Sequence, residues 1–244
     1  SWEYYNEKGQ LSYRINYKFG KEESLRETYH YYDVGNLYSK GNFLRGKKEG
    51  SWKYFHSNGN LETKGSYKKD EKVGTWINYN YNYNGQVLTK ESFKGEVLDG
   101  PWEEYHENGF LKTKGFYDEE GNQSGTWFKF YENGQIYSKE KKYYGWAMGP
   151  SEFYYPNGQL ESFGNRHMDG RVGEWKFYHE NGKLESFGEY MDVGKNGPWK
   201  YYNDIGNLIS KGNYYVKKEG PWKYFNDDGS LKVTKNYSHG ELVE

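Results

Sequence analysis

The sequence GPWKYYNDIGNLISKGNYYVKKEG, residues 197–220, decides the fold, because near-copies of it fill the chain. It begins again as GPWKYFNDDGSLKVTKNY from Gly220, and it occurs upstream as GEWKFYHENGKLESFGEY from Gly173 and GSWKYFHSNGNLETKGSY from Gly50. Self-similarity at a period of about 24 residues is typical of repeat architectures, in which each copy packs against its neighbours. Residues 1–244 are therefore predicted to form one tandem-repeat array.

Ten copies align on the tryptophan of this stretch. They start near residues 1, 26, 50, 74, 100, 125, 149, 173, 197 and 220. The aligned position holds Trp2, Thr28, Trp52, Trp76, Trp102, Trp127, Ser151, Trp175, Trp199 and Trp222. An aromatic residue stands three positions later in every copy, and a glycine stands two positions earlier in eight of the ten. This regularity indicates structural roles for the tryptophan, the aromatic and the glycine.

A turn signal follows the aromatic residue in each copy. The Asn-Gly pairs begin at Asn58, Asn84, Asn108, Asn133, Asn157 and Asn181. Asn-Gly between two β-type segments predicts a hairpin, because both residues tolerate the positive φ angles of a type I′ turn. Each copy is therefore expected to be one β-hairpin closed by a type I′ turn.

The second half of each copy alternates in the manner of a half-buried strand. Leu61, Thr63, Gly65 and Tyr67, for example, alternate with polar or charged residues. The mid-strand glycine recurs at Gly41, Gly65, Gly115, Gly164, Gly188 and Gly212. Glycine is unfavourable inside a strand, so we expect it to make room for a neighbouring ring, foremost the repeat tryptophan.

The first strand cannot place the tryptophan and the aromatic three residues later on one face by strict alternation. A bulge, or a tryptophan placed in the turn before the strand, would account for this spacing. No segment shows a sustained helical period. The fold class predicted is all-β: an elongated, single-layer antiparallel β-meander of about ten hairpins, in which aromatic rings, 21% of the residues, replace an aliphatic core.

These features resemble the MORN repeat (membrane occupation and recognition nexus), in the variant form grouped with YwqK-like antitoxin proteins of bacteria. GPWKYYNDIGNLISKGNY at 197–214 and GPWEEYHENGFLKTKGFY at 100–117 carry every element of the motif. The resemblance implies a gently twisted array of hairpins that serves as a binding scaffold. It transfers no catalytic residue, and the copies with Thr28 and Ser151 depart from the motif.

The composition argues against several other classes of protein. The formal net charge is -1 with both signs mixed along the chain, which disfavours nucleic-acid binding and direct membrane association. There is no cysteine, and His56, His106 and His179 occupy one repeated position at the entry to the turn, too regularly spaced to converge on a metal. We predict no catalytic, cofactor-binding or metal-binding residues, and so no enzyme.

One position varies among copies while its neighbours do not. It lies two residues after the tryptophan, and we expect it to form an exposed functional face. The predicted partner-binding residues there are Tyr54, Phe153, Phe177, Tyr201 and Tyr224. Trp146, the one tryptophan outside the repeat position, joins them as a candidate, with a structural alternative in which it fills the space left by Ser151.

The resulting hypothesis is a non-enzymatic scaffold that binds a protein partner, as a toxin-neutralising antitoxin or immunity protein or at the cell surface. The alternatives are a carbohydrate-binding aromatic array and a membrane-associated MORN scaffold. End-to-end self-association through the edge strands is a further expectation. The chain begins at Ser1 inside a copy, which we interpret as a trimmed fragment, and an exported or cell-surface location is favoured over a cytoplasmic one.

Overall fold

The computed structural model describes residues 2–18, 21–29, 36–82 and 85–243, with the backbone alone over residues 16–29. The chain comprises two compact units, residues 1–122 and 123–244. The first unit contains β1 (Trp2–Tyr5), β2 (Leu11–Lys18), β3 (Lys21–Tyr29), β4 (Leu37–Leu44), β5 (Lys47–Phe55), β6 (Leu61–Lys68), β7 (Glu71–Tyr79), β8 (Val87–Lys94), β9 (Val97–Tyr105) and β10 (Leu111–Tyr117).

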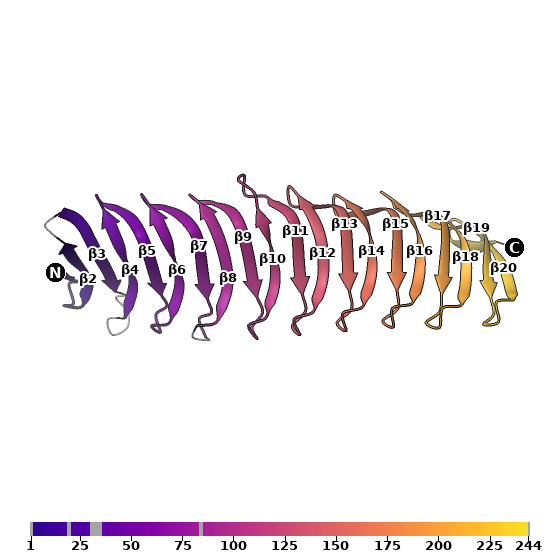
Figure 1. Cartoon of the computed structure of the whole chain (residues 1–244), viewed down its shortest axis with the longest axis horizontal. Helices are drawn as coiled ribbons and strands as arrows, with labels where there is room; N and C mark the ends of the chain where they lie inside the picture. The colour runs from indigo at the N-terminus through magenta and orange to yellow at the C-terminus, as the bar shows by residue number, and fades with distance from the viewer. Residues whose placement is uncertain (1, 19–20, 30–35, 83–84, 244) are drawn as a thin grey trace. The chain divides into compact units, whose positions relative to one another are not determined.

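The second unit repeats the same plan. It contains β11 (Gln123–Phe130), β12 (Ile136–Tyr143), β13 (Trp146–Tyr154), β14 (Leu160–His167), β15 (Gly170–Tyr178), β16 (Leu184–Met191), β17 (Gly194–Tyr202), β18 (Leu208–Tyr215), β19 (Lys217–Phe225), β20 (Leu231–Ser238) and β21 (Glu241–Val243). Within each unit every strand pairs antiparallel with the next one in the chain, giving a single-layer meander (Figure 1). The described residues contain no helix, so the predicted all-β fold is confirmed.

The Asn-Gly turns close the hairpins, but their type differs from the prediction. In the third copy the Gly59 amide donates to the His56 carbonyl at 2.9 Å, and the His56 amide donates to Asn60 at 2.8 Å. Gly59 has a φ of +87°, whereas Asn58 is not among the residues of positive φ. The turn is therefore a type I turn followed by a left-handed glycine, and the expected type I′ turn was wrong at this position.

Type I′ turns occur instead at the other end of the strands, where there is no Asn-Gly pair. Lys69 and Asp70 connect β6 to β7 with φ angles of +56° and +75°, and Met168 and Asp169 connect β14 to β15 with +48° and +64°. The Asp169 carboxylate accepts the Ala147 amide of the preceding connection at 2.8 Å. The left-handed aspartate is thus held by a bond to the neighbouring copy, an interaction that local sequence does not reveal.

In the copy that begins at Gly197, two irregularities place the aromatic residues on opposite faces of the sheet. Gly197, two residues before Trp199, has a φ of +66°, and all eight glycines at this position have positive φ. The register then shifts again between Tyr201 and Tyr202. Trp199 and Tyr201 lie on one face, which we call the tryptophan face, and Tyr202 packs on the other, against Phe187. The predicted bulge is confirmed, with the tryptophan inside the strand.

The mid-strand glycine makes room for the tryptophan of the next copy, as expected. The Trp199 ring lies over Gly188 of β16 so closely that a Cβ there would stand 2.4 Å from ring carbons. Four other pairs repeat this arrangement: Gly41 with Trp52, Gly65 with Trp76, Gly164 with Trp175 and Gly212 with Trp222. These tryptophans are 0–3% exposed. Because the tryptophan ring lies flat on a glycine, which has no side chain, even a single-layer sheet can bury it.

The exceptions follow the same rule. Glu91 stands where a glycine would precede Trp102, and Trp102 is only partly buried. Lys235 occupies the glycine position of β20, and the strand after it, β21, carries no tryptophan. Where the glycine is replaced, the following indole is either displaced toward solvent or absent.

The copy that carries Ser151 fills the space in a different way from the one suggested by the sequence. Trp146 is 52% exposed at the start of β13, so the idea that it fills the missing ring's place is wrong. Glu140 replaces the glycine opposite Ser151, and its carboxylate lies 3.1 Å from the Arg166 guanidinium. A buried ion pair thus occupies the volume of an indole, and Trp146 remains in solvent.

Candidate functional site

The predicted partner-binding row lies on the tryptophan face, where it is half-buried. Tyr201 stacks on Trp199 at 5.9 Å between ring centroids and contacts the following Trp222 at 6.0 Å. Similar ring contacts link Phe153, Trp175, Phe177 and Trp199 in chain order, and link Tyr54 to Trp52 and Trp76. The row was expected to be exposed. It instead alternates with the tryptophans and helps to bury them, and its part in binding stays a prediction.

A lysine completes each aromatic cluster. The Lys195 ammonium lies 4.1 Å from the centre of the Trp199 ring and 5.2 Å from the centres of both Tyr201 and Tyr214. It donates a hydrogen bond of 2.8 Å to the Tyr201 hydroxyl, which lies 3.1 Å from that of Tyr214. We call this group of one cation and three rings an aromatic cage.

Three other copies build the same cage. Lys48 lies over Trp52, Tyr54 and Tyr67, and Lys218 lies over Trp222, Tyr224 and Tyr237. In the third of these cages the cation is an arginine, and the Arg171 guanidinium lies over Trp175, Phe177 and Tyr190. The cation always stands four residues before the tryptophan. Sequence reasoning overlooked this position, although a basic residue there in these copies was a visible signal.

The cages perturb the acid-base properties of their members. Burial raises the pKa of the Tyr201 hydroxyl well above its usual 10.0, and the hydrogen bond with Tyr214 adds to the effect. Burial also lowers the pKa of the Lys195 ammonium, assisted by the nearby charge of Arg171. Each cage is already occupied by a cation of the chain itself, which leaves no place for an external cationic ligand.

The opposite face carries a second row of side chains. It consists of the residue that follows each tryptophan position and of the residues that pair with it on the neighbouring strands. Successive strands pair Phe163 with Lys176, Lys176 with Phe187, and Phe187 with Lys200. The ammonium of Lys176 lies 5.6 Å from the Phe163 ring centre, and that of Lys200 lies 5.4 Å from Phe187. Lysine ammonium groups therefore lie over the Phe163 and Phe187 rings of this face.

Carboxylates interrupt this row, and Glu152 and Glu103 are each bound by a tyrosine and a lysine. Glu152 accepts a hydrogen bond from the Tyr154 hydroxyl at 2.5 Å and lies 3.3 Å from the Lys139 ammonium. Burial, together with the bond to Glu152, raises the pKa of Tyr154 to about 12. Glu103 makes the same arrangement with Tyr105 and Lys90 in the first unit. These networks stabilise the sheet and offer no free acid-base pair.

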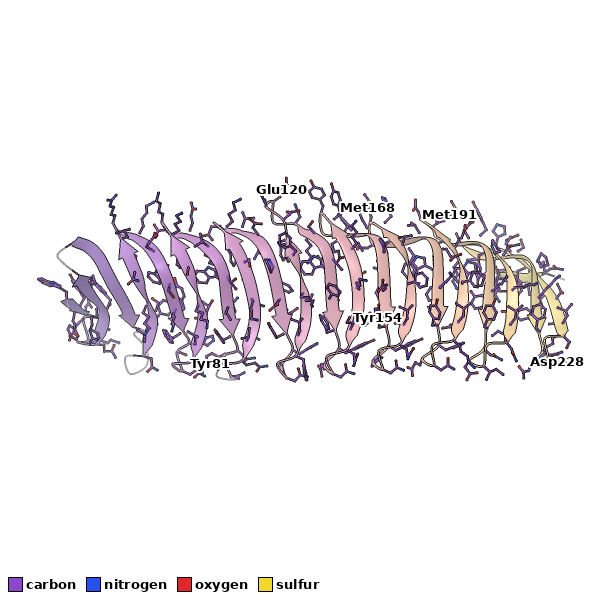
Figure 2. The ribbon with its side chains drawn as sticks, viewed as in Figure 1. Tyr81, Glu120, Tyr154, Met168, Met191 and Asp228 are labelled. Carbon is purple, nitrogen blue, oxygen red and sulfur yellow. The ribbon has the colours of Figure 1, made fainter. Side chains whose placement is uncertain are left out.

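A line of exposed apolar side chains follows one edge of the second unit. It lies at the connections β12–β13, β14–β15, β16–β17 and β18–β19, and Figure 2 shows Met168 and Met191 along this edge. We call the line the apolar ridge, which consists of Tyr143, Tyr144, Trp146, Met168, Met191, Val193, Tyr215 and Val216, 45–73% exposed. The Val216 amide donates to the Lys195 carbonyl at 2.8 Å, so neighbouring connections of the ridge are held side by side.

The β6–β7 connection of the first unit is charged, and other connections there mix charged and apolar residues, with Leu44 and Val97 41% and 42% exposed. Lys68, Lys69, Asp70 and Glu71 form the β6–β7 connection, and Arg45 begins the β4–β5 connection. The contrast shows that the repeat itself does not require apolar residues at these turns. Among the described residues, exposed apolar side chains therefore occupy more of these connections in the second unit than in the first, and Trp146 is the one predicted site residue in the ridge.

The Asn-Gly edge is held together by bonds between copies. The Asn181 side chain accepts the Lys183 amide at 3.0 Å and donates to the Asp204 carbonyl of the next copy at 2.7 Å. Asn133 and Asn157 bond the following copy in the same way. His179 lies at the turn entry, as predicted, and its Nε2 is 3.0 Å from the Tyr202 carbonyl.

Other kinds of site find no support in the described part of the chain. It contains no group of three or more His, Asp or Glu side chains that could hold a metal ion. It also contains no helix of the length and hydropathy needed to cross a membrane. Beside the predicted row on the tryptophan face, the apolar ridge and the lysine-rich opposite face are candidate surfaces for function.

Comparison with known proteins agrees with the repeat structure. The profile of the MORN repeat variant matches residues 48–69, 98–119, 123–143, 149–162, 171–191 and 218–239, which together make up half of the chain. No curated protein matches the sequence. Five of the matched segments each span one hairpin described above, and residues 149–162 cover most of β13 and the start of β14. The chain belongs to the MORN repeat variant family, whose repeats form scaffolds for protein or membrane interaction.

Proposed function

We propose that the protein is a non-enzymatic scaffold that binds a protein partner through the apolar ridge of its second unit. The single observation that carries the proposal is the exposure of this ridge. Monomeric soluble proteins rarely expose contiguous apolar side chains, and those that do use them for interaction. Val193 and Tyr215, each 73% exposed, contribute little to the sheet in this position.

The chemistry of the ridge suits a protein interface. Tyrosine, tryptophan and methionine are enriched at such interfaces, because rings bury a large area and methionine adapts to irregular surfaces. Trp146 and Tyr144 supply the rings, while Met168 and Met191 supply flexible apolar contacts. The sheet beneath them is rigid, so binding would order few additional residues.

The identity of the partner is a further step. A toxin held in an antitoxin or immunity complex, and a protein at the cell surface, both fit a preformed apolar edge. The YwqK-like subtype would favour the first of these. A carbohydrate ligand receives less support, because the rings of the predicted row pack against tryptophans and those of the opposite face lie under lysines.

The proposal is tested by a quantitative pull-down from the source cell with the full chain. The ridge variant is Met168→Asp, Met191→Asp, Val193→Asp and Tyr215→Asp, which is expected to reduce capture of the partner at least tenfold with an unchanged thermal midpoint. The matched control places the same charge at Lys68→Asp and Lys69→Asp in the first unit, and this should retain capture.

A parallel assay separates a protein partner from a membrane. Pelleting with liposomes of neutral lipid should leave the protein in the supernatant. If the wild-type protein pellets with liposomes and the ridge variant does not, the ridge binds membranes, and the proposal of a protein partner is wrong. Equal capture by wild type and ridge variant would also contradict it.

A further inference from the structure

Three lysines lie side by side on the opposite face of the second unit. Lys200 of β17 pairs across the sheet with Lys211 of β18, and Lys211 pairs with Lys223 of β19. Adjacent strands are about 4.8 Å apart, so the three side chains leave the sheet as immediate neighbours. Lys200 and Lys223 are exposed, and Lys211 is half-buried.

No carboxylate neutralises this group. Among the described residues, none of the three lysines takes part in an ion pair, whereas Lys139 in the same row is paired with Glu152. Like charges directly opposite each other on a sheet are destabilising. An anion bound between the three ammonium groups would offset this repulsion.

The lysines surround a shallow hollow. Its volume is about 220 Å³, and Pro198 and Pro221 stand beside Lys200, Lys211 and Lys223 in its lining. The prolines add apolar lining beside the three lysines, and the volume is sufficient for a short side chain that carries its charge at the end.

We propose that this hollow and its three lysines bind an acidic polypeptide segment, with a glutamate or aspartate side chain entering between Pro198 and Pro221. The inference rests on the proposed protein-binding function, but it uses a surface separate from the apolar ridge. The charge of the segment is the feature recognised, through hydrogen bonds donated by the ammonium groups to carboxylate oxygens.

The surroundings favour a polypeptide over other polyanions. The Lys200 ammonium lies over the Phe187 ring, and that of Lys211 lies 5.6 Å from the centre of Phe225. A nucleic acid or a glycan would gain by stacking bases or sugars on such rings, but the lysines already cover them. The formal charge of the whole chain is -1, which provides no long-range attraction for nucleic acid.

The first unit carries the same arrangement on β4, β5 and β6. Lys40 pairs with Lys53, and Lys53 pairs with Lys64. Binding by this row could hide a loss of binding in the second unit. The lysines of the second unit are therefore substituted both with this row intact and with it removed.

The experiment measures binding of a fluorescent deca-glutamate peptide to the full chain by anisotropy. The second-row variant, K200Q/K211Q/K223Q, is prepared with and without K40Q/K53Q/K64Q. The control variant, K8Q/K47Q/K68Q/K69Q/K94Q/K217Q, removes six exposed lysines at or beside turns, so it changes the net charge as much as the combined variant does. We expect the combined row variant to bind at least tenfold more weakly than wild type, and the control variant to bind as wild type does.

A second readout locates the contact. Carbodiimide joins a carboxylate to an ammonium group at contact distance, and mass spectrometry should find the peptide on Lys200, Lys211 or Lys223. Cross-links confined to other lysines, equal losses in row and control variants, or tighter binding of an oligonucleotide or a sulfated glycan would overturn the inference. If the peptide fails to bind while the ridge variant still loses its partner, this inference falls and the proposed function stands.

Discussion

Trp199 lies flat on Gly188 of the preceding copy, and its indole Nε1 donates a hydrogen bond of 3.2 Å to the carbonyl of Glu189, the next residue along that strand. The Trp199 ring is thus held by two contacts with β16: close packing on Gly188 and a hydrogen bond to Glu189. The pair joins two copies that are otherwise linked by backbone hydrogen bonds and smaller contacts. Its removal should affect the interface between the copies more than either hairpin.

The first prediction concerns this seat. Gly188→Ala places a methyl group 2.4 Å from ring carbons of Trp199, so the ring must shift. We expect a loss of about 1–3 kcal/mol in the free energy of unfolding, measured by urea denaturation. Glu189→Ala, at an exposed side chain, should change little. In a Trp199→Ala background the cost of Gly188→Ala should largely vanish, and an additive double variant would contradict the steric explanation.

The second prediction concerns the aromatic cage. Tyr201→Phe removes the hydroxyl that accepts from Lys195 and leaves both rings in place. The expected cost is about 1 kcal/mol, because a hydrogen bond to a charged donor is lost at a half-buried site. Tyr201→Ala should cost more, since it also uncovers Trp199 and Trp222. If both substitutions are neutral, the ring is not part of the packing and its interpretation as a free binding residue regains support.

The third prediction separates two bonds made by one side chain. Asn181→Asp keeps the acceptor for the Lys183 amide but loses the donor to Asp204, whereas Asn181→Ala loses both. Each bond is expected to contribute about 0.5–1.5 kcal/mol. The Asp variant should therefore lie between wild type and the Ala variant in chemical denaturation. An Asp variant as weak as the Ala variant would show that the local turn bond contributes nothing.

The fourth prediction concerns the copy that lacks the repeat tryptophan. Glu140→Ala leaves the partly buried Arg166 guanidinium without its carboxylate, with an expected loss of about 2 kcal/mol or more. Ser151→Trp alone should also destabilise, because Glu140 occupies the seat. The double variant Ser151→Trp, Glu140→Gly restores the repeat pattern and should be more stable than either single variant. Calorimetry of the four proteins decides the matter.

The fifth prediction concerns alkaline pH. The folded-state pKa of Tyr154 is raised from 10.0 to about 12, and those of Tyr67 and Tyr201 are raised as well. A raised tyrosine pKa stabilises the fold fully below pH 10, and this contribution is lost as the pH rises from about 10 to about 12. Urea midpoints should fall over that window. Tyr154→Phe should reduce the slope, and a tyrosinate absorbance titration gives the pKa independently.

The sequence was sufficient to predict the repeat, the hairpins and the glycine seat, and it left a bulge as one of two explanations for the first strand. Each depends on residues that are close in sequence or recur at a fixed spacing. The seat at Gly188, for example, follows from the cost of glycine in a strand together with the presence of a large ring in every neighbouring copy. The alternation of apolar and polar residues along the second strand of each hairpin then placed this glycine on the buried face.

What the sequence did not reveal depends on contacts between copies. The Asn-Gly pair suggested a type I′ turn from local preference, but the Asn181 side chain bonds both its own turn and the next copy. Trp146 could not be placed, because Glu140 and Arg166 come together only when three strands are in register. The ridge lies at turns whose residues differ from copy to copy, so no repeated signal identified it.

The seating of each tryptophan on the copy before it gives the array a direction. A copy supplies a glycine to its successor and requires one from its predecessor, so the two sides of any copy are not equivalent. Removing the predecessor leaves an indole bare to solvent, whereas removing the successor leaves only an unoccupied glycine. New copies can therefore be added after an existing seat at little cost. A duplication inserted ahead of Trp199 must bring its own glycine, and this constrains how such a chain can lengthen by duplication.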